Sequence, residues 1–302
     1  MNPSWIELEI EVPAATAEVL ADAVGALTGG VEIRDAETIL RIGAGRAVIV
    51  TQCHPDAEDE IRAELEAACV RLREAGLSPE PMAVRRREAS EDEWRDVWKK
   101  HFRALRVGRH FLVRPSWDLV PPGPGDRVID IDPGRAFGTG GHASTRLVIA
   151  MTDELSDELA AAGTPSPVRT FLDLGCGSGI LSIAAARLWP DARGLAMDVD
   201  PEAVATTGEN LDLNGITSVE RRVGSLDEAG APVDLLLANI EASVLVPLAP
   251  QFPAHLASGA TLILSGLLRS DVDAITRAYA AVGLTIVARR DEDEWSALRL
   301  QR

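Results

Sequence analysis

The feature that most constrains the fold is the stretch 170–179, which reads Thr-Phe-Leu-Asp-Leu-Gly-Cys-Gly-Ser-Gly. Its apolar first half is typical of a buried strand, and the run 180–189 has helical periodicity and strong helix formers. Between them stand Gly175, Gly177 and Gly179, which let the backbone approach a ligand closely, and the helix start offers free amide donors. The pattern predicts a strand, a glycine-rich turn and a helix, which make half of a Rossmann-like unit.

The spacing of these glycines separates two classes of nucleotide site. A dinucleotide fingerprint reads Gly-x-Gly-x-x-Gly, whereas this chain reads Gly-x-Gly-x-Gly with Ile180 in the place of the third dinucleotide glycine. With Asp173 two residues before it, the motif resembles the first motif of the S-adenosylmethionine-dependent methyltransferases. A structural turn, or a site for another nucleotide cofactor, is the alternative that this motif alone leaves open.

An acidic residue follows at the distance that such a site requires. Residues 193–198 are predicted to form the next strand, which ends on Asp198. An acid about twenty residues past the glycines is placed to accept both ribose hydroxyls of an adenosine. Asp200 is followed by Pro201, a pair typical of a helix cap and first turn. We therefore predict that Asp198 binds the ribose and that Asp200 caps a helix.

Polar residues also follow the later strands. Asp227 lies in the loop after the third predicted strand, where it faces the adenine edge or is simply a surface acid. Asn239 ends the fourth strand, which is fully apolar. Ligands of open parallel sheets bind outside the carboxyl ends of the strands. The residues predicted to converge at this edge are Gly175, Asp198, Asp227 and Asn239.

A second glycine-rich segment, 132–145, leads into a predicted helix. A loop of this composition can fold over a ligand with hydroxyl and amide donors turned inward, and a plain connector is the alternative. Phe137 is predicted to cover the cofactor and to exclude water. His142 is a candidate general base, with stacking or hydrogen bonding in the loop as the simpler role.

The charge balance narrows the class of partner. The chain has 30 basic and 47 acidic residues and a formal net charge of −17. Such a field repels phosphate backbones, so direct nucleic-acid binding is not expected, whereas a basic protein would be attracted.

The lengths of the apolar runs and the number of cysteines indicate the cellular compartment. No run approaches the roughly 18 apolar residues of a membrane span, and no secretory signal is visible. The 3 cysteines are odd in number and not in Cys-x-x-Cys pairs. They predict a reducing cytoplasm, no disulfide framework and no metal site.

The order of predicted elements indicates two domains. Up to residue 82 the pattern gives a strand, a helix, further strands, one of them at 37–42, and a second helix, and residues 82–87 are typical of a last strand. This order is typical of a small ferredoxin-like α+β domain. Residues 83–112 are predicted to form a helical connector, with the aromatic stripe of its helix 91–102 packing on a neighbouring domain. Residues 113–302 are predicted to be a Rossmann-like α/β domain whose sheet closes with an antiparallel hairpin, as methyltransferase sheets do.

Several segments together resemble one family, the ribosomal protein L11 methyltransferases. The segment Asp132-Pro-Gly-Arg-Ala-Phe-Gly-Thr-Gly is highly specific for this family. The other segments that resemble it are 93–102, 113–117, 122–126, 173–181, 238–240 and 294–295.

The resemblance implies an N-terminal domain that recognises the substrate and a C-terminal class I methyltransferase domain that binds S-adenosylmethionine. It implies trimethylation of lysine side chains and of the N-terminal amine of a basic ribosomal protein, by a cytoplasmic enzyme that we expect to be a monomer. The family's cofactor-binding residues fall on Thr145, Gly175, Asp198 and Asn239. We assign Asn239 a second role, which is to orient the amine.

Two positions depart from the family pattern. The family has Thr-His-Pro-Thr-Thr where this chain has Gly-His-Ala-Ser-Thr at 141–145, with the last threonine kept. It has Asn-Ile-Leu-Ala where this chain carries Glu241 after Asn239 and Ile240. Glu241 therefore puts the protein target in question, and the alternative target is a lysine of another protein, such as the electron-transfer flavoprotein β-subunit.

Overall fold

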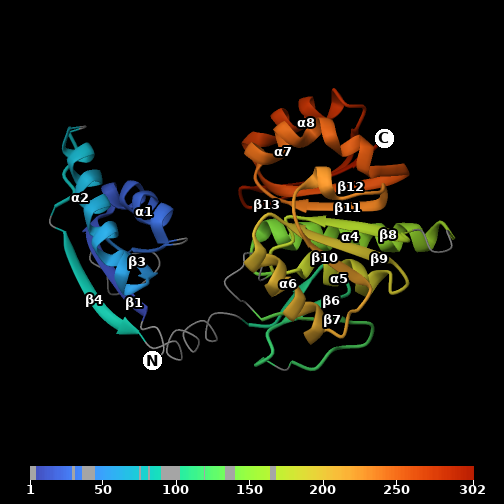
Figure 1. Ribbon diagram of the computed structural model, residues 1–302, viewed down its shortest axis with the longest axis horizontal. Helices are drawn as coiled ribbons and strands as arrows, with labels where there is room; N and C mark the ends of the chain where they lie inside the picture. The colour runs from blue at the N-terminus through green and yellow to red at the C-terminus, as the bar shows by residue number, and fades with distance from the viewer. Residues whose placement is uncertain are drawn as a thin grey trace. The chain divides into compact units, whose positions relative to one another are not determined.

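A computed structural model describes residues 5–28, 31–35, 45–74, 76–80, 82–89, 103–118, 120–132, 140–163 and 168–302. The chain divides into two compact units, Met1–His101 and Phe102–Arg302 (Figure 1). Among the described residues, no helix is both long enough and apolar enough to cross a lipid bilayer.

The first unit is a four-stranded sheet with two helices. Its strand order is β2-β3-β1-β4, and each pair of neighbours is antiparallel. This order, with the helices after β1 and β3, is ferredoxin-like, as predicted. Its elements are β1 (Trp5–Pro13), α1 (Ala14–Thr28), β2 (Val31–Asp35), β3 (Arg46–Cys53), η1 (Pro55–Ala57), α2 (Glu58–Glu74) and β4 (Ala83–Ala89).

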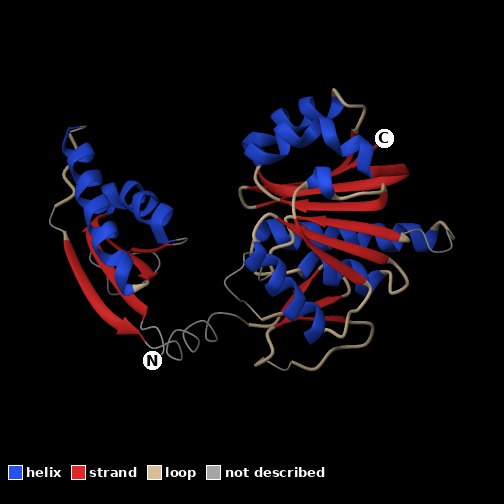
Figure 2. Cartoon of the chain, viewed as in Figure 1, coloured by secondary structure: helices blue, strands red, loops and turns tan. Residues whose placement is uncertain are grey.

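The alternation in β1 creates the core of the first unit. Ile6, Leu8, Ile10 and Val12 are fully buried, while the glutamates between them lie on the opposite face of the sheet. Apolar side chains of α1 and α2 join the same core, and Figure 2 shows both helices beside the strands. Burying each such aliphatic side chain stabilises the unit by about 1.5–3 kcal/mol.

The structure corrects the predicted connector at 83–112. Strand β4 pairs with β1, for example Arg85 with Glu9, so it belongs to the first unit rather than to a connector. The second unit begins at Phe102 and contains two strands that were predicted as connector. The predicted strand at 37–42 and the predicted helix at 91–102 lie outside the described residues.

The second unit is built on a seven-stranded sheet of order β10-β9-β8-β11-β12-β14-β13. The pairs from β10 to β12 are parallel, and β14 runs antiparallel to both of its neighbours. This is the predicted methyltransferase sheet with its closing hairpin. Its strands are β8 (Thr170–Leu174), β9 (Arg193–Asp198), β10 (Val219–Val223), β11 (Val233–Asn239), β12 (Leu256–Leu268), β13 (Thr285–Glu292) and β14 (Trp295–Gln301).

Helices cover both faces of this sheet because its central strands are apolar on both sides. Phe171 and Leu235 face one core and Leu172 and Leu236 face the other. Figure 1 shows α7 and α8 on one face and the helices α4, α5 and α6 on the other. The helices are α4 (Ala143–Ala161), α5 (Ile180–Leu188), α6 (Pro201–Leu213), α7 (Ala242–Leu248) and α8 (Val272–Ala280), with short turns η2 (Leu226–Glu228), η3 (Ala249–His255) and η4 (Arg269–Asp271).

A small sheet, β5-β6-β7, joins the α4–α5 face of the second unit. Its strands are β5 (Leu105–Val107), β6 (Phe111–Arg114) and β7 (Arg127–Asp130). The buried Asp153 of α4 accepts hydrogen bonds from the backbone N–H groups of Arg109 (2.8 Å) and His110 (3.1 Å) in the β5–β6 turn. The sequence analysis missed β5 and β6, which are short.

Candidate functional site

The glycine-rich turn after β8 has a backbone that only glycine adopts readily. Gly175, Gly177 and Gly179 have φ angles of +73°, +52° and +81°. A Cβ atom on Gly175 would lie 2.3 Å from a side-chain methyl of Ile240, and one on Gly179 would lie 2.9 Å from a methyl of Thr207. The tight turn predicted for these glycines is therefore seen in the geometry, and their approach by a ligand stays a prediction.

Asp198 lies at the end of β9 beside this turn. Its Oδ2 accepts a hydrogen bond from Gly177 N–H (3.0 Å) and its Oδ1 accepts one from Asp200 N–H (3.0 Å). Each carboxylate oxygen keeps a further acceptor position for a ligand hydroxyl. Asp200 caps α6 by accepting from Glu202 N–H (2.8 Å), so the prediction that Asp200 is a cap is confirmed.

Asn239 and Thr145 meet at the opposite side of the turn. Asn239 ends β11, and its Nδ2 donates to Thr145 Oγ1 (3.2 Å) in the first turn of α4. Thr145 is fully buried. The resemblance assigned both residues to the cofactor, and the fold brings them together although 94 positions separate them.

Two buried oxygens at this edge have no hydrogen-bond partner among the described residues, Asn239 Oδ1 and Asp173 Oδ1. Asp173 is fully buried near the end of β8, and its Oδ2 accepts from the N–H (2.9 Å) and hydroxyl (2.7 Å) of Ser182. Desolvation raises the pKa of the Asp173 carboxyl to about 6, although the bonds from Ser182 oppose the rise. Unpaired buried acceptors are rare, so these two oxygens mark a candidate position for a polar ligand group or an ordered water.

The register of the sheet aligns the predicted ligands. Leu174 pairs with Met197 and with Ala238, and Val223 pairs with Asp198. The residues that follow β8, end β9 and end β11 therefore lie side by side at the carboxyl edge, as predicted. Asp227 follows β10 in the short turn η2 and is exposed.

His142 occupies a structural position at the start of α4. It caps the helix, since its Nδ1 accepts from Ser144 N–H (3.3 Å), and its ring contacts Trp295 edge to face at 4.6 Å. Burial lowers the pKa of His142 and the nearby Arg146 lowers it further, while Glu294 opposes the shift. These contacts match the stacking and hydrogen-bonding role. Phe137 lies outside the described residues.

Sequence reasoning missed the side chains that hold the turn. Thr207 on α6 donates to Gly177 O (2.9 Å), and Asn210 Nδ2 on the same helix donates to Ser178 O (2.9 Å). Both side chains are buried. The sequence feature that could have identified them is the spacing of Thr207 and Asn210, which places two polar residues on one face of the helix. Within the described ranges, His, Cys, Asp and Glu side chains form no group of three that could hold a metal ion.

Glu241, the departure from the family pattern, is exposed. It sits at the N-cap position of α7, and its carboxylate accepts from the Ser243 hydroxyl (3.1 Å). It does not contact Asn239 Oδ1, which has no partner among the described residues.

Comparison with known proteins gives a consistent result. The family described as ribosomal protein L11 methyltransferase (PrmA) matches residues 4–302. A ribosomal protein L11 methyltransferase of Pelobacter propionicus is 37% identical over 313 residues, which cover 100% of this chain and 99% of the relative. One of Geobacter metallireducens is 36% identical over 310 residues, with 100% and 99% covered.

Among solved structures, the ribosomal protein L11 methylase of Lactobacillus delbrueckii subsp. bulgaricus matches with a TM-score of 0.58 and 32% identity, covering 67% of this chain and 99% of that chain. None of these names supports the alternative target, a flavoprotein subunit. The chain belongs to the ribosomal protein L11 methyltransferase family.

Proposed function

We propose that this protein transfers methyl groups from S-adenosylmethionine to amines of ribosomal protein L11. The observation that carries the proposal is the family match over residues 4–302, which spans both units of the chain. A ribosomal-protein substrate would place the enzyme in the cytoplasm. The net charge of −17 suits a basic substrate. A monomer is the oligomeric state that we propose.

The carboxyl edge of the large sheet supports the cofactor assignment. Asp198 would accept the ribose hydroxyls, and the turn at Gly175 and Gly177 would let the cofactor approach the backbone. When bound, S-adenosylmethionine supplies an electrophilic methyl group on a sulfonium. Asp227, one short turn beyond β10, would contact the adenine edge.

The amine must reach the site neutral. Deprotonating a lysine with a pKa of about 10.4 near pH 7 costs about 4–5 kcal/mol. Asn239 lies between the fully buried Ala238 and the half-buried Ile240. Apolar surroundings of this kind would lower the pKa of an incoming amine by desolvation. Asn239 Oδ1, buried and without a partner among the described residues, would accept a hydrogen bond from the amine and orient its lone pair.

His142 would fix the first turn of α4 as its N-cap, and so would hold Thr145 in place. Its Nδ1 is engaged by Ser144, and its pKa is lowered by burial. No general base is needed for the transfer step if the amine arrives neutral, because its lone pair is already free to attack the methyl group.

Purified L11 and tritiated S-adenosylmethionine test the proposal directly. We expect label on L11 with the full-length protein. Absence of label, with an active reference methyltransferase as control, would contradict the substrate assignment.

Two variants separate orientation of the amine from cofactor binding. Asn239→Ala should lower kcat more than it raises the KM for the cofactor, because the bond acts mainly in the transition state. Asn239→Asp adds a negative charge that favours the protonated amine, so its rate should recover partly as pH rises. A parental rate and pH profile for Asn239→Asp would show that Asn239 does not contact the amine.

We also propose that the first unit recognises the protein substrate. Protein truncated to residues 90–302 should bind S-adenosylhomocysteine like the full chain but methylate intact L11 poorly. Methylation at the full rate would remove this role.

A further inference from the structure

Helix α6 and its C-cap residue carry three buried polar side chains on one face, Thr207, Asn210 and the C-cap Asn214, with exposures of 0%, 2% and 7%. Their spacing of three and four residues places them in a line along the helix. Buried polar groups are normally hydrogen-bonded. Here the bonds run to the backbone of other segments, so the line of side chains fixes the position of those segments.

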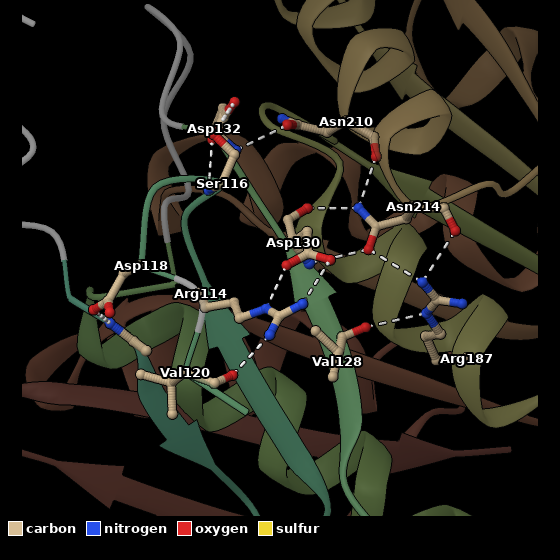
Figure 3. Close-up of polar contacts among 11 residues, drawn as sticks. Arg114, Ser116, Asp118, Val120, Val128, Asp130, Asp132, Arg187, Asn210 and Asn214 are labelled. Atoms are coloured by element: carbon tan, nitrogen blue, oxygen red, sulfur yellow. Dashed lines mark hydrogen bonds and ion pairs between the residues drawn. The ribbon is translucent and has the colours of Figure 1, made fainter. Parts of the chain in front are cut away.

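Asn210 bonds two segments at once. Its Nδ2 donates to Ser178 O in the glycine turn (2.9 Å), and its Oδ1 accepts from Asp132 N–H (3.1 Å) just beyond β7. Figure 3 shows Asn210 directed toward Asp132. Asp132 is the first residue of the second glycine-rich segment, 132–145. One side-chain amide therefore joins the turn to the end of the small sheet.

Asn214 contacts the small sheet but not the turn. Its Oδ1 accepts from Asp130 N–H (3.0 Å), and its Nδ2 donates to Asp130 O (2.5 Å) (Figure 3). In an extended chain, the backbone N–H groups of residues 130 and 132 point to the same side. Asn214 bonds to residue 130 and Asn210 bonds to residue 132, so the two side chains act on this edge as a neighbouring strand would. Arg187 completes this side by donating to Val128 O (3.1 Å) and to Asn214 O (3.0 Å).

The side chains of Asp130 and Asp132 are also held, by residues of β6 and of the turn that follows it. Asp132 accepts from the N–H (3.0 Å) and hydroxyl (2.9 Å) of Ser116, and the Asp130 carboxylate pairs with Arg114 (2.6 Å) (Figure 3). A displacement of Ser178 relative to Asp132 would therefore have to break the bonds of Asn210, because Asp132 itself is held.

We propose that Asn210 is a positioning residue of the cofactor site, which holds the Ser178 carbonyl, and with it the glycine turn, at a fixed place relative to Asp132. The inference rests on the proposed function. It assigns Asn210 a role in cofactor affinity and assigns Asn214, one turn along the same helix, a role in stability alone.

The test compares one substitution at two positions of the full-length protein. Asn210→Asp replaces the donor to Ser178 O with a carboxylate oxygen, while Asn214→Asp makes the same change opposite Asp130 O. Affinity for S-adenosylhomocysteine is measured by calorimetry at a temperature at which thermal unfolding shows every variant folded. A second variant, Asn210→Ala, removes both bonds without adding a charge.

We expect Asn210→Asp to lose at least about tenfold in affinity, because two buried oxygens are brought face to face. Asn210→Ala should lose at least about threefold, whereas Asn214→Asp should stay within about twofold of the parent while its melting temperature falls. In the methyl-transfer assay, Asn210→Asp should raise the KM for the cofactor more than it lowers kcat.

Parental affinity in Asn210→Ala or Asn210→Asp would overturn the inference, and so would equal losses at positions 210 and 214. If the parent protein itself fails to bind S-adenosylhomocysteine, the proposed function falls, and this inference falls with it. The two failures are therefore distinguishable by the parent's titration.

Discussion

The two units of the chain differ in what they bury. Among the described residues of the first unit, the buried polar side chains are Thr16 and Thr51, and the rest of the core is apolar. In the second unit, buried polar side chains gather around the glycine turn and the carboxyl edge of the sheet. They include Ser144, Thr145, Asp173, Ser178, Ser182, Thr207 and Asn210, while the buried Asn214 contacts the small sheet instead.

The two cores therefore differ in how closely they fix the backbone. An apolar core holds a sheet together without specifying the position of any one backbone group. A buried polar group destabilises the fold unless it is bonded, so a cluster of bonded groups fixes backbone positions closely. The unpaired oxygens of Asp173 and Asn239 lie within that cluster. We therefore place the methyl-transfer chemistry in the second unit, and the proposed role of the first unit stays recognition of the protein substrate.

The largest effect should come from the turn. Gly179→Ala adds a Cβ at φ +81° that would lie 2.9 Å from a Thr207 methyl and 3.2 Å from Thr207 Cα. Backbone strain and crowding together should cost about 2–5 kcal/mol, shared between unfolding free energy and cofactor affinity. Chemical denaturation and calorimetry with S-adenosylhomocysteine measure the two parts.

The matched control is Gly215→Ala. Gly215 has φ +65° but nothing within 4 Å of an added Cβ. It should show only the strain, about 1–2 kcal/mol in unfolding free energy, with unchanged affinity. An equal loss of affinity in both variants would mean that the packing around Gly179 is not special.

Cavities in the two cores should have different consequences. Ile10→Ala in β1 and Ile263→Ala in β12 each truncate a fully buried side chain and should each cost about 3 kcal/mol in unfolding free energy. Differential scanning calorimetry should assign the losses to different transitions, and S-adenosylhomocysteine should raise only the transition of the second unit. A single transition that shifts equally in both variants would argue against independent units.

The pH dependence of stability should carry the signature of Asp173. Its folded-state pKa of about 6 is above the ordinary 3.8, so the folded protein holds a proton that the unfolded chain releases first. This contribution is fully present below pH about 4 and is lost as pH rises through about 6, with a size of up to about 3 kcal/mol. Asp173→Asn should lack this loss. Parallel pH–stability curves from denaturant titrations of the two proteins would contradict it.

A smaller difference in cofactor affinity should distinguish Asp198, which ends β9, from Asp200, which follows it. Asp198→Ala removes a charged acceptor for the ribose and should weaken cofactor binding by about 1.5–3 kcal/mol. Asp200→Ala removes only a helix cap and should cost about 1 kcal/mol in unfolding free energy, with little change in affinity. Calorimetric titrations decide between them, and the reverse order of effects would exchange the two roles.

The ends of the parallel strands could be predicted from sequence because they depend on local patterns. Gly175, Asp198 and Asn239 each follow an apolar run, and parallel pairing brings such ends together in any sheet of this class. Asp200 was identified as a cap from its neighbour Pro201, another local signal.

What the sequence did not reveal depends on distant partners. Asn210 and Asn214 look like surface residues of an amphipathic helix, and their backbone partners lie 78 and 84 positions away at Asp132 and Asp130. Strands β5 and β6 have 3 and 4 residues, too few for a periodic pattern. A strand at 82–87 was predicted, but the domain boundary at residue 82 separated it from the first unit, because the pairing of β4 with β1 is also non-local.

Hydrogen–deuterium exchange of the full-length protein, with and without S-adenosylhomocysteine, tests most directly the claim that the cofactor binds at the carboxyl edge of the large sheet. We predict new protection at 174–182, 198–200, 224–228 and 239–241, and unchanged exchange throughout 5–89. Protection confined to the first unit, or unchanged exchange across the glycine turn at a saturating ligand concentration, would contradict the account.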